Sequence, residues 1–407
     1  MLGDLYGRWM YRWETALTTR DTNRIVRPVE WGFEWLLEFT QSHGFSLAHH
    51  LPADHAAGER AMLELNDFIL QHRGEFFAYR TPQDFVLEER HPQLYPTNVR
   101  PETLQRDARL RQRAADGTLP TAQFLRFTSP VRTPYPENDR VNARWFPAPE
   151  KLAGKPKQAI IVMPQWNADA FSHNVLCSIF NRFGVSALRL SKPYHDIRRP
   201  AELERADYAV SANVGRTIAS CRQAVIDIRC CIDWLEQQGY EQFGILGTSL
   251  GSCYAFLAGA LDSRVRVGAF NHASMSFGDV VWTGQSTRHI RAAFESISMT
   301  QQRLRDVWAA VSPSCYMDQF AANPKKILLV HATYDLTFLE EYSLQVIENF
   351  RRRGVDFVSK VLPCGHYTTG ETPYKFMDGW YLGSFVYSAF KQLAAVASSP
   401  RNELFAR

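Results

Sequence analysis

The sequence carries little excess charge: 46 Lys and Arg against 42 Asp and Glu leave a formal net charge of +4 over 407 residues. So small a balance argues against a nucleic-acid partner, which usually needs a strongly basic surface. No run approaches the ~18 apolar residues of a membrane span, and the first residues lack the apolar core of a secretory signal peptide. The absence of a Gly-x-Gly-x-x-Gly or phosphate-loop pattern argues against nucleotide binding.

Cysteine is also scarce, at seven residues with irregular spacing. Cys230 and Cys231 are adjacent within an expected helix and cannot bridge each other. We therefore expect free, mostly buried thiols in a reducing compartment, and hence a cytoplasmic location. Four histidines cluster within residues 43–55, but no acidic or cysteine ligand is spaced among them in a recognised metal-binding pattern. We expect no metal and no organic cofactor.

Short apolar runs from residue 120 onward alternate with helical patterns, which indicates a mainly parallel sheet flanked by helices. The long helix expected over residues 213–238 carries one apolar stripe at steps of three and four, and Gly239 is a natural stop. The expected strands lie at 124–127, 141–146, 159–163, 185–190, 243–246, 265–270, 326–330 and 355–362.

Two segments depart from this rhythm. Residues 1–120 are rich in aromatics and arginine and predict a helical N-terminal extension, with a surface loop over residues 80–101. Residues 274–324 are helical in pattern and too long for a plain loop, so we expect a helical cap insertion there. The core then comprises residues 121–273 and 325–407. The aromatic N-terminal helices could support a homo-oligomer.

The stretch over residues 243–259 has the most specific pattern in the chain. An apolar run leads into Gly247-Thr248-Ser249-Leu250-Gly251, and small and apolar residues follow. A strand, a sharp turn and a helix in this order place a serine hydroxyl above a helix N-terminus, where the amide of Leu250 faces a forming oxyanion. The alternative is a glycine-rich turn whose serine merely caps the helix.

The rest of the chain favours the first interpretation. Asp335 follows the strand at 326–330, and His366 follows the last strand in the sequence Cys364-Gly365-His366. In an open α/β sheet, ligand sites gather at the carboxyl ends of the strands. A serine, an acid and a histidine, each just past a strand and in this order, are hard to obtain by chance.

This order of elements and motifs resembles the α/β-hydrolase superfamily over about residues 120 to 395. The resemblance implies a catalytic triad of Ser249, His366 and Asp335. Asp279, which follows the preceding strand, is the competing acid. The more distant features are similar to a poorly characterised intracellular branch, with acetyl-ester and dienelactone hydrolases as the nearest well-known relatives.

The resemblance also implies a second oxyanion donor in the loop after the strand at 159–163. Many relatives have His-Gly there, whereas this chain has Pro164-Gln165-Trp166-Asn167. Because such a donor acts through its backbone N–H, Trp166 is our first choice by position and Gln165 the second; Pro164 has no N–H to donate.

Substrate contacts are expected at the same edge and in the cap. Gln165 and Asn167 are candidates by position. Phe277, Trp282 and Met317 could line an apolar acyl pocket, or they could form the cap's own core. His195 and His272 follow strands at this edge and are weaker candidates.

The sequence thus predicts a carboxylesterase-like serine hydrolase that acts on a small-molecule acyl ester through an acyl-enzyme. A peptidase or an acyltransferase could use the same three residues. A binding protein that keeps the fold without turnover is the alternative from another class.

Overall fold

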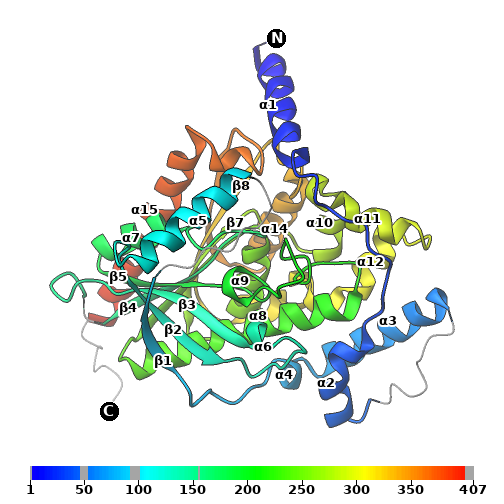
Figure 1. Ribbon diagram of the computed structural model, residues 1–407, viewed down its shortest axis with the longest axis horizontal. Helices are drawn as coiled ribbons and strands as arrows, with labels where there is room; N and C mark the ends of the chain where they lie inside the picture. The colour runs from blue at the N-terminus through cyan, green and yellow to red at the C-terminus, as the bar shows by residue number, and fades with distance from the viewer. Residues whose placement is uncertain (1, 46–53, 92–100, 155, 399–407) are drawn as a thin grey trace, which may run out of the picture.

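The computed structural model describes residues 2–45, 54–91, 101–154 and 156–398. The described residues form a nine-stranded sheet with the strand order β1-β2-β3-β5-β4-β6-β7-β8-β9 (Figure 1). The strands from β5 to β9 in this order run parallel, whereas β1, β2 and β3 pair antiparallel at one edge. The strands are β1 Val86–Arg90, β2 Ala122–Thr128, β3 Arg140–Phe146, β4 Gln158–Met163, β5 Val185–Leu190, β6 Gln242–Thr248, β7 Val265–Asn271, β8 Lys326–Ala332 and β9 Asp356–Leu362.

The predicted fold class is confirmed, and each of the eight strands expected from residue 120 onward is found, with ends that differ by at most two residues. One expectation is wrong. Residues 86–90, expected in a surface loop of a helical extension, form β1, which pairs antiparallel with β2. The strand lies at the sheet edge and none of its residues is buried, so its sequence lacks the apolar alternation that marks a half-buried strand.

Two layers of helices cover the sheet, because successive side chains of its buried strands point to opposite faces. Ile161 of β4 and Ile245 of β6 contribute to the core beneath α8 and α9, whereas Val162 and Leu246 contribute to the core beneath α7 and α15. The helices are α1 Leu2–Thr19, α2 Leu37–Ser42, α3 His55–Gln71, α4 Arg73–Phe76, α5 Pro101–Ala115, α6 Pro136–Asp139, α7 Asn174–Arg182, α8 Val214–Gln237, α9 Leu250–Leu261, α10 Phe277–Thr283, α11 Arg288–Glu295, α12 Gln301–Val307, α13 Met317–Ala322, α14 Glu340–Arg352 and α15 Tyr374–Ser398.

Helix α8 shows how the sequence sets an element. Its N-cap is Asn213, whose side chain accepts a hydrogen bond from the Arg216 backbone N–H at 2.9 Å. The predicted apolar stripe is buried along its length against the sheet. Gly239, with φ of +78°, lies just beyond its end, where a left-handed residue is favourable.

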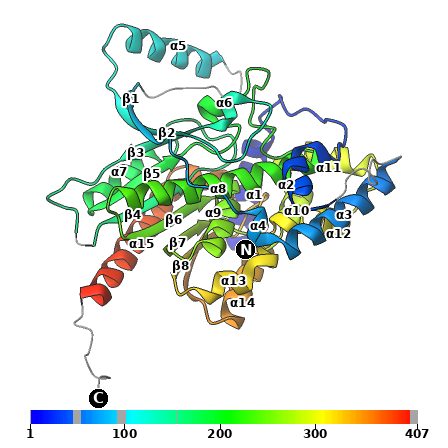
Figure 2. The same cartoon turned by 90° about the horizontal axis from the view of Figure 1, so that it is seen from below.

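Residues 277–322 contain four α-helices, α10 to α13, where the sequence predicts a cap. In Figures 1 and 2, α10, α11, α12 and the N-terminal helix α3 lie together on one side of the molecule, away from α7 and α15. Buried Asn66 of α3 joins the two segments: its amide donates to the Val307 carbonyl at 2.8 Å and accepts from the Ala310 N–H at 2.9 Å. Helix α3 therefore packs on the segment 277–322.

No helix in the described part of the chain is long and apolar enough to cross a bilayer. All seven cysteines are unbridged, and all except the partly buried Cys315 are buried.

Candidate active site

Ser249 lies at the turn between β6 and α9, with φ of 57° and ψ of −121°. A non-glycine residue at such positive φ is strained. Neither flanking glycine could carry a side chain, because a Cβ on Gly247 would lie 2.4 Å from the Gly251 carbonyl oxygen and a Cβ on Gly251 would lie 2.1 Å from the Met163 carbonyl oxygen. The two glycines thus let β6, α9 and the loop after β4 approach one another closely.

This packing makes a prediction about Gly251. We expect Gly251→Ala to lower the free energy of unfolding by about 3 kcal/mol, the upper end of the usual cost of overpacking, because backbone atoms must move to admit the methyl group. The matched control is Gly259→Ala in the same helix, where the Cβ would meet Phe320 at an ordinary 3.4 Å. That change should be neutral or mildly stabilising, since alanine is the better helix former. Urea denaturation of both variants measures the difference; equal stabilities would contradict the packing argument.

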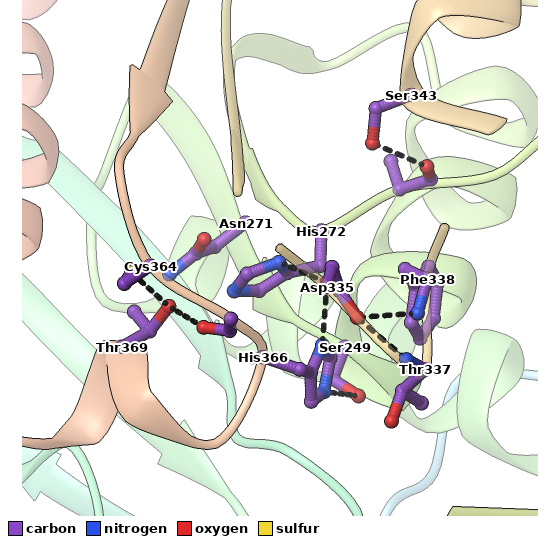
Figure 3. Close-up of polar contacts among 12 residues, drawn as sticks. Ser249, Asn271, His272, Asp335, Thr337, Phe338, Ser343, Cys364, His366 and Thr369 are labelled. Carbon is purple, nitrogen blue, oxygen red and sulfur yellow. Dashed lines mark hydrogen bonds and ion pairs between the residues drawn. The ribbon is translucent and has the colours of Figure 1, made fainter. Parts of the chain in front are cut away.

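The structure brings the three residues of the predicted triad together (Figure 3). His366 Nε2 lies 2.9 Å from Ser249 Oγ, and His366 Nδ1 lies 2.9 Å from Asp335 Oδ2. A carboxylate can only accept, so Nδ1 carries the proton and Nε2 is left with a lone pair toward the serine hydroxyl. Each residue follows the carboxyl end of a parallel strand, β6, β8 or β9.

Both carboxylate oxygens of Asp335 accept hydrogen bonds. Its Oδ1 accepts hydrogen bonds from the backbone N–H groups of Thr337 and Phe338, both at 2.7 Å, which fixes the carboxylate plane. Burial alone would raise the pKa of Asp335, but His366 and His272 beside it hold that pKa well below its usual range. The group is therefore an anion at neutral pH.

His366 responds to that anion. Burial would lower the pKa of its imidazole, but the charge and hydrogen bond of Asp335, with a smaller effect of Glu14, raise the pKa above its ordinary value. The Phe338 ring stacks parallel to the imidazole with centroids 5.4 Å apart. The imidazole is thus held by the hydrogen bond between its Nδ1 and Asp335 and by the face of the Phe338 ring.

His272 is a further partner of Asp335 that the sequence did not assign. It follows β7, adopts φ of 59°, and its Nδ1 lies 2.9 Å from the same Oδ2 that faces His366. Burial and the neighbouring His366 lower its pKa, so the ring is neutral. The sequence placed His272 at this edge of the sheet as a weak substrate candidate; its position after β7, between the strands of Ser249 and Asp335, was the available signal.

Asp279, the competing acid, lies elsewhere. It sits in the first turn of α10, where its carboxylate pairs with the Arg305 guanidinium at 2.9 Å and accepts from the Gln301 amide at 2.8 Å. Its oxygens are engaged within residues 277–322, whereas His366 faces Asp335.

The amide of Leu250 begins α9, and no hydrogen bond to it is recorded within the described residues. In the loop after β4, the N–H of Asn167 donates to His195 Nε2 at 3.1 Å and that of Ala168 donates to the Gln165 carbonyl at 3.2 Å. The N–H groups of Gln165 and Trp166 have no recorded partner in the part of the chain described. Both candidates for the second donor therefore remain.

Side chains hold this loop in place. Buried Lys192 donates to the Gln165 carbonyl at 2.9 Å, and the Trp166 indole N–H donates to the Ala206 carbonyl at 2.9 Å. The amide oxygen of Asn167, which the sequence predicted to contact substrate, accepts a hydrogen bond from the Ala206 N–H at 2.8 Å and so helps to hold the loop. Trp166 also stacks on His289, with centroids 6.2 Å apart.

The three residues expected to line an acyl pocket differ in how deeply they are buried. Phe277 and Met317 are 3% and 1% exposed, and Phe277 packs edge-on against Trp308. Their burial favours the interpretation that they form the cap's own core. Trp282 is partly buried, with the Arg291 guanidinium 5.3 Å from its ring centre.

His272, Asp335 and His366 also form the one group of three potential metal ligands found within the described ranges, with ligand atoms within 4.8 Å of one another. His366 already forms hydrogen bonds with Asp335 Oδ2 and Ser249 Oγ, so the arrangement suits a hydrogen-bonded relay. Of the histidine cluster at residues 43–55, His49 and His50 lie outside the described residues.

No protein-family model and no curated protein matches this sequence. Among solved structures, acetyl xylan esterase 1 from Thermoanaerobacterium sp. superimposes with a TM-score of 0.53 at 14% identity, over 80% of this chain and 94% of that one. An acylaminoacyl peptidase from Pyrococcus horikoshii gives 0.47 at 11% identity, over 68% of this chain and 46% of its own. The chain thus spans about half the length of that peptidase. The esterase Pf2001 from Pyrococcus furiosus gives 0.44 at 13% identity, over 67% and 92%. Together with the sheet order, the first of these likenesses shows that the chain has the α/β-hydrolase fold.

Proposed function

We propose that this chain is a serine hydrolase that cleaves a small acyl ester through an acyl-enzyme. The observation that carries the proposal is the continuous contact from Ser249 through His366 to Asp335, at 2.9 Å and 2.9 Å, on a strained turn at the carboxyl edge of the sheet. Position, tautomer and charge all suit proton transfer from the serine hydroxyl.

In this mechanism Ser249 Oγ attacks the acyl carbonyl carbon as His366 Nε2 takes its proton. The carbonyl oxygen becomes an oxyanion, which the Leu250 N–H and one N–H of the loop after β4 would hold; each donor of this kind is typically worth about 3 kcal/mol. The imidazolium, stabilised by the Asp335 anion, then gives its proton to the departing alcohol. The neutral imidazole then takes a proton from water, which attacks the acyl-enzyme and releases the carboxylic acid and free Ser249.

Burial around the serine bears on the substrate. Ser249 is only 6% exposed and the His366 side chain 9%. A folded polypeptide could not reach a hydroxyl so enclosed, which favours a small molecule. The seven unbridged cysteines favour a reducing compartment, and we propose a cytoplasmic location on that basis.

The proposal is tested by treating the native protein with a fluorophosphonate probe and mapping the adduct by peptide mass spectrometry. We expect a single adduct on Ser249, absent after heat denaturation because the triad no longer activates the hydroxyl. No adduct on the native protein would contradict hydrolase function and favour a binding protein.

Ester and amide cleavage are separated by matched substrates with one acyl group, such as p-nitrophenyl acetate and p-nitroacetanilide, followed by longer acyl chains. We expect hydrolysis of the ester with a much lower rate for the anilide. Comparable or greater kcat/KM on the anilide would favour the peptidase alternative instead.

A further inference from the structure

One face of helix α1 lies along the loop that carries His366. Tyr6, Met10, Glu14 and Thr18 recur at steps of four, and so share a face of the helix. The Tyr6 hydroxyl donates to the Pro363 carbonyl, and Met10 Sδ lies 3.5 Å from the Thr368 hydroxyl. At the far end the Thr18 hydroxyl donates to the Gln285 side chain at 2.6 Å. The helix therefore spans from the catalytic loop to the segment before α11.

Glu14 makes the most specific of these contacts. Its Oε1 accepts the Tyr367 backbone N–H at 2.8 Å, and its Oε2 accepts the Thr368 N–H at 3.0 Å and the Thr368 hydroxyl at 3.1 Å. The Glu14 residue is 0% exposed. The two amides are those that directly follow His366, so the carboxylate fixes the backbone on which the catalytic ring is mounted.

The chain makes room for this carboxylate. A Cβ on Gly365 would lie 2.3 Å from Glu14 Oε2, so a larger residue before His366 would have to displace the Glu14 carboxylate. The Thr368 hydroxyl, in turn, accepts the Gly365 N–H at 2.6 Å, which closes a ring of contacts under the loop. A buried charge survives only with such compensation, because an unpaired one is costly to remove from water.

Charge connects Glu14 to the reaction centre as well. Burial raises the pKa of Glu14, while the two amides and the nearby His366 oppose that rise. The groups that face His366 are Asp335, Glu14 and neutral His272, and both carboxylates favour the imidazolium form. Cys364 lies on the same loop, and the charge of Glu14 also acts on its thiol. Burial raises the pKa of this thiol to about 12, so it stays neutral.

We propose that Glu14 is a positioning residue for His366: it anchors the loop after β9 through two backbone amides and places a second negative charge near the catalytic imidazole. The proposal rests on the proposed function for its kinetic consequences. Its structural content, that the charge at residue 14 affects the protonation of His366, holds whatever the substrate.

The test compares Glu14→Gln and Glu14→Asp with Glu34→Gln, a control at an exposed glutamate of the N-terminal segment. Glutamine keeps the shape but brings an N–H group toward a backbone donor and removes the charge. We expect kcat on an activated ester to fall about 10- to 100-fold in Glu14→Gln with little change in KM, because a displaced base slows chemistry more than binding. Glu34→Gln should match the wild type.

The pH dependence distinguishes positioning from simple anchoring. Activity needs neutral His366, so kcat/KM rises as pH increases through the imidazole pKa. Loss of the Glu14 charge should lower that pKa and move this acid limb to lower pH. Glu14→Asp keeps the charge but is one methylene shorter, so it should retain the wild-type limb while losing part of kcat. A carboxylate that only anchors α1 would change stability and leave the limb unmoved.

A second readout does not depend on turnover. In protein labelled with ¹⁵N-histidine, the His366 signal is identified by its loss in His366→Gln, and its titration is followed by NMR. We expect a lower pKa in Glu14→Gln than in the wild type. An unchanged titration in a folded variant would overturn the proposal even if the wild type reacts with the fluorophosphonate probe. A wild type that does not react, with a shifted titration, would overturn only the hydrolase function.

If Glu14→Gln does not fold, Thr368→Val tests the anchoring of the loop with a smaller change, and Glu14→Asp tests it at residue 14 itself. Valine keeps the shape of threonine and removes only the hydroxyl that contacts Glu14 and Gly365. We expect a smaller loss of kcat with unchanged KM. Full wild-type kcat in both Thr368→Val and Glu14→Asp, which disturb different contacts of the Glu14 carboxylate, would overturn the proposed anchoring of the loop.

Discussion

Replacing Ser249 by alanine is expected to lower kcat for an activated acyl ester by about 10⁶-fold, because the covalent route is removed while the buried site stays otherwise intact. The loss should appear in kcat, with KM little changed, since the hydroxyl acts mainly in the transition state. The measurement is steady-state hydrolysis of p-nitrophenyl acetate, with background hydrolysis subtracted. Some activity above that background is expected to remain, because the oxyanion donors and substrate binding are unchanged.

The control for this variant is Ser178→Ala, at an exposed serine of α7 whose hydroxyl bonds only its own helix, to the Asn174 carbonyl at 3.0 Å. It should keep wild-type kinetics. If Ser249→Ala retained more than a few per cent of activity in a preparation free of contaminating esterase, the nucleophile would have to be a different residue.

The second large effect is expected from Asp335→Asn, which should lower kcat by about 10⁴-fold. An asparagine amide can turn its NH₂ toward His366 Nδ1, which then becomes the acceptor and moves the ring proton to Nε2. In that tautomer the ring cannot take the serine proton. The pKa of His366 should also fall in this variant, because the Asp335 anion that raises it is lost.

Asp279→Asn is the matched comparison, because both residues are buried acids that follow neighbouring strands of the sheet. It should weaken the contact with Arg305 and lower stability, yet leave kcat near the wild-type value. Kinetics and thermal unfolding measured side by side separate the two roles. A larger loss of kcat in Asp279→Asn than in Asp335→Asn would reverse the assignment of the acid.

Sequence patterns predicted most of the scaffold because the central strands of the sheet are buried on both faces. Strands β4 and β8 read as continuous apolar runs for that reason, and helix α8 is marked in the sequence by an apolar stripe and by Gly239 as a stop. Ser249, Asp335 and His366 could be proposed because each lies shortly after the end of a predicted strand. Strand topology alone then places the three at one edge.

The contacts of His272, Glu14 and strand β1 could not be predicted from local patterns. His272 follows a strand too, but only coordinates show that its ring faces Asp335 rather than a substrate. Glu14 contacts residues more than 350 positions away, and a single glutamate in an amphipathic helix gives no sign of what it touches. Strand β1 was missed because exposed edge residues need no apolar alternation.

The contact between Glu14 and the amide of Tyr367, 353 positions apart in the chain, has a consequence for how the protein folds. During synthesis the helix that bears Glu14 emerges long before the last strand and must wait with its carboxylate unpaired. Contacts between such remote segments form late, since the entropy of closing so large a loop has to be overcome first. The arrangement of the proposed active site should therefore be among the last features that the folding chain acquires, well after its sheet and buried core.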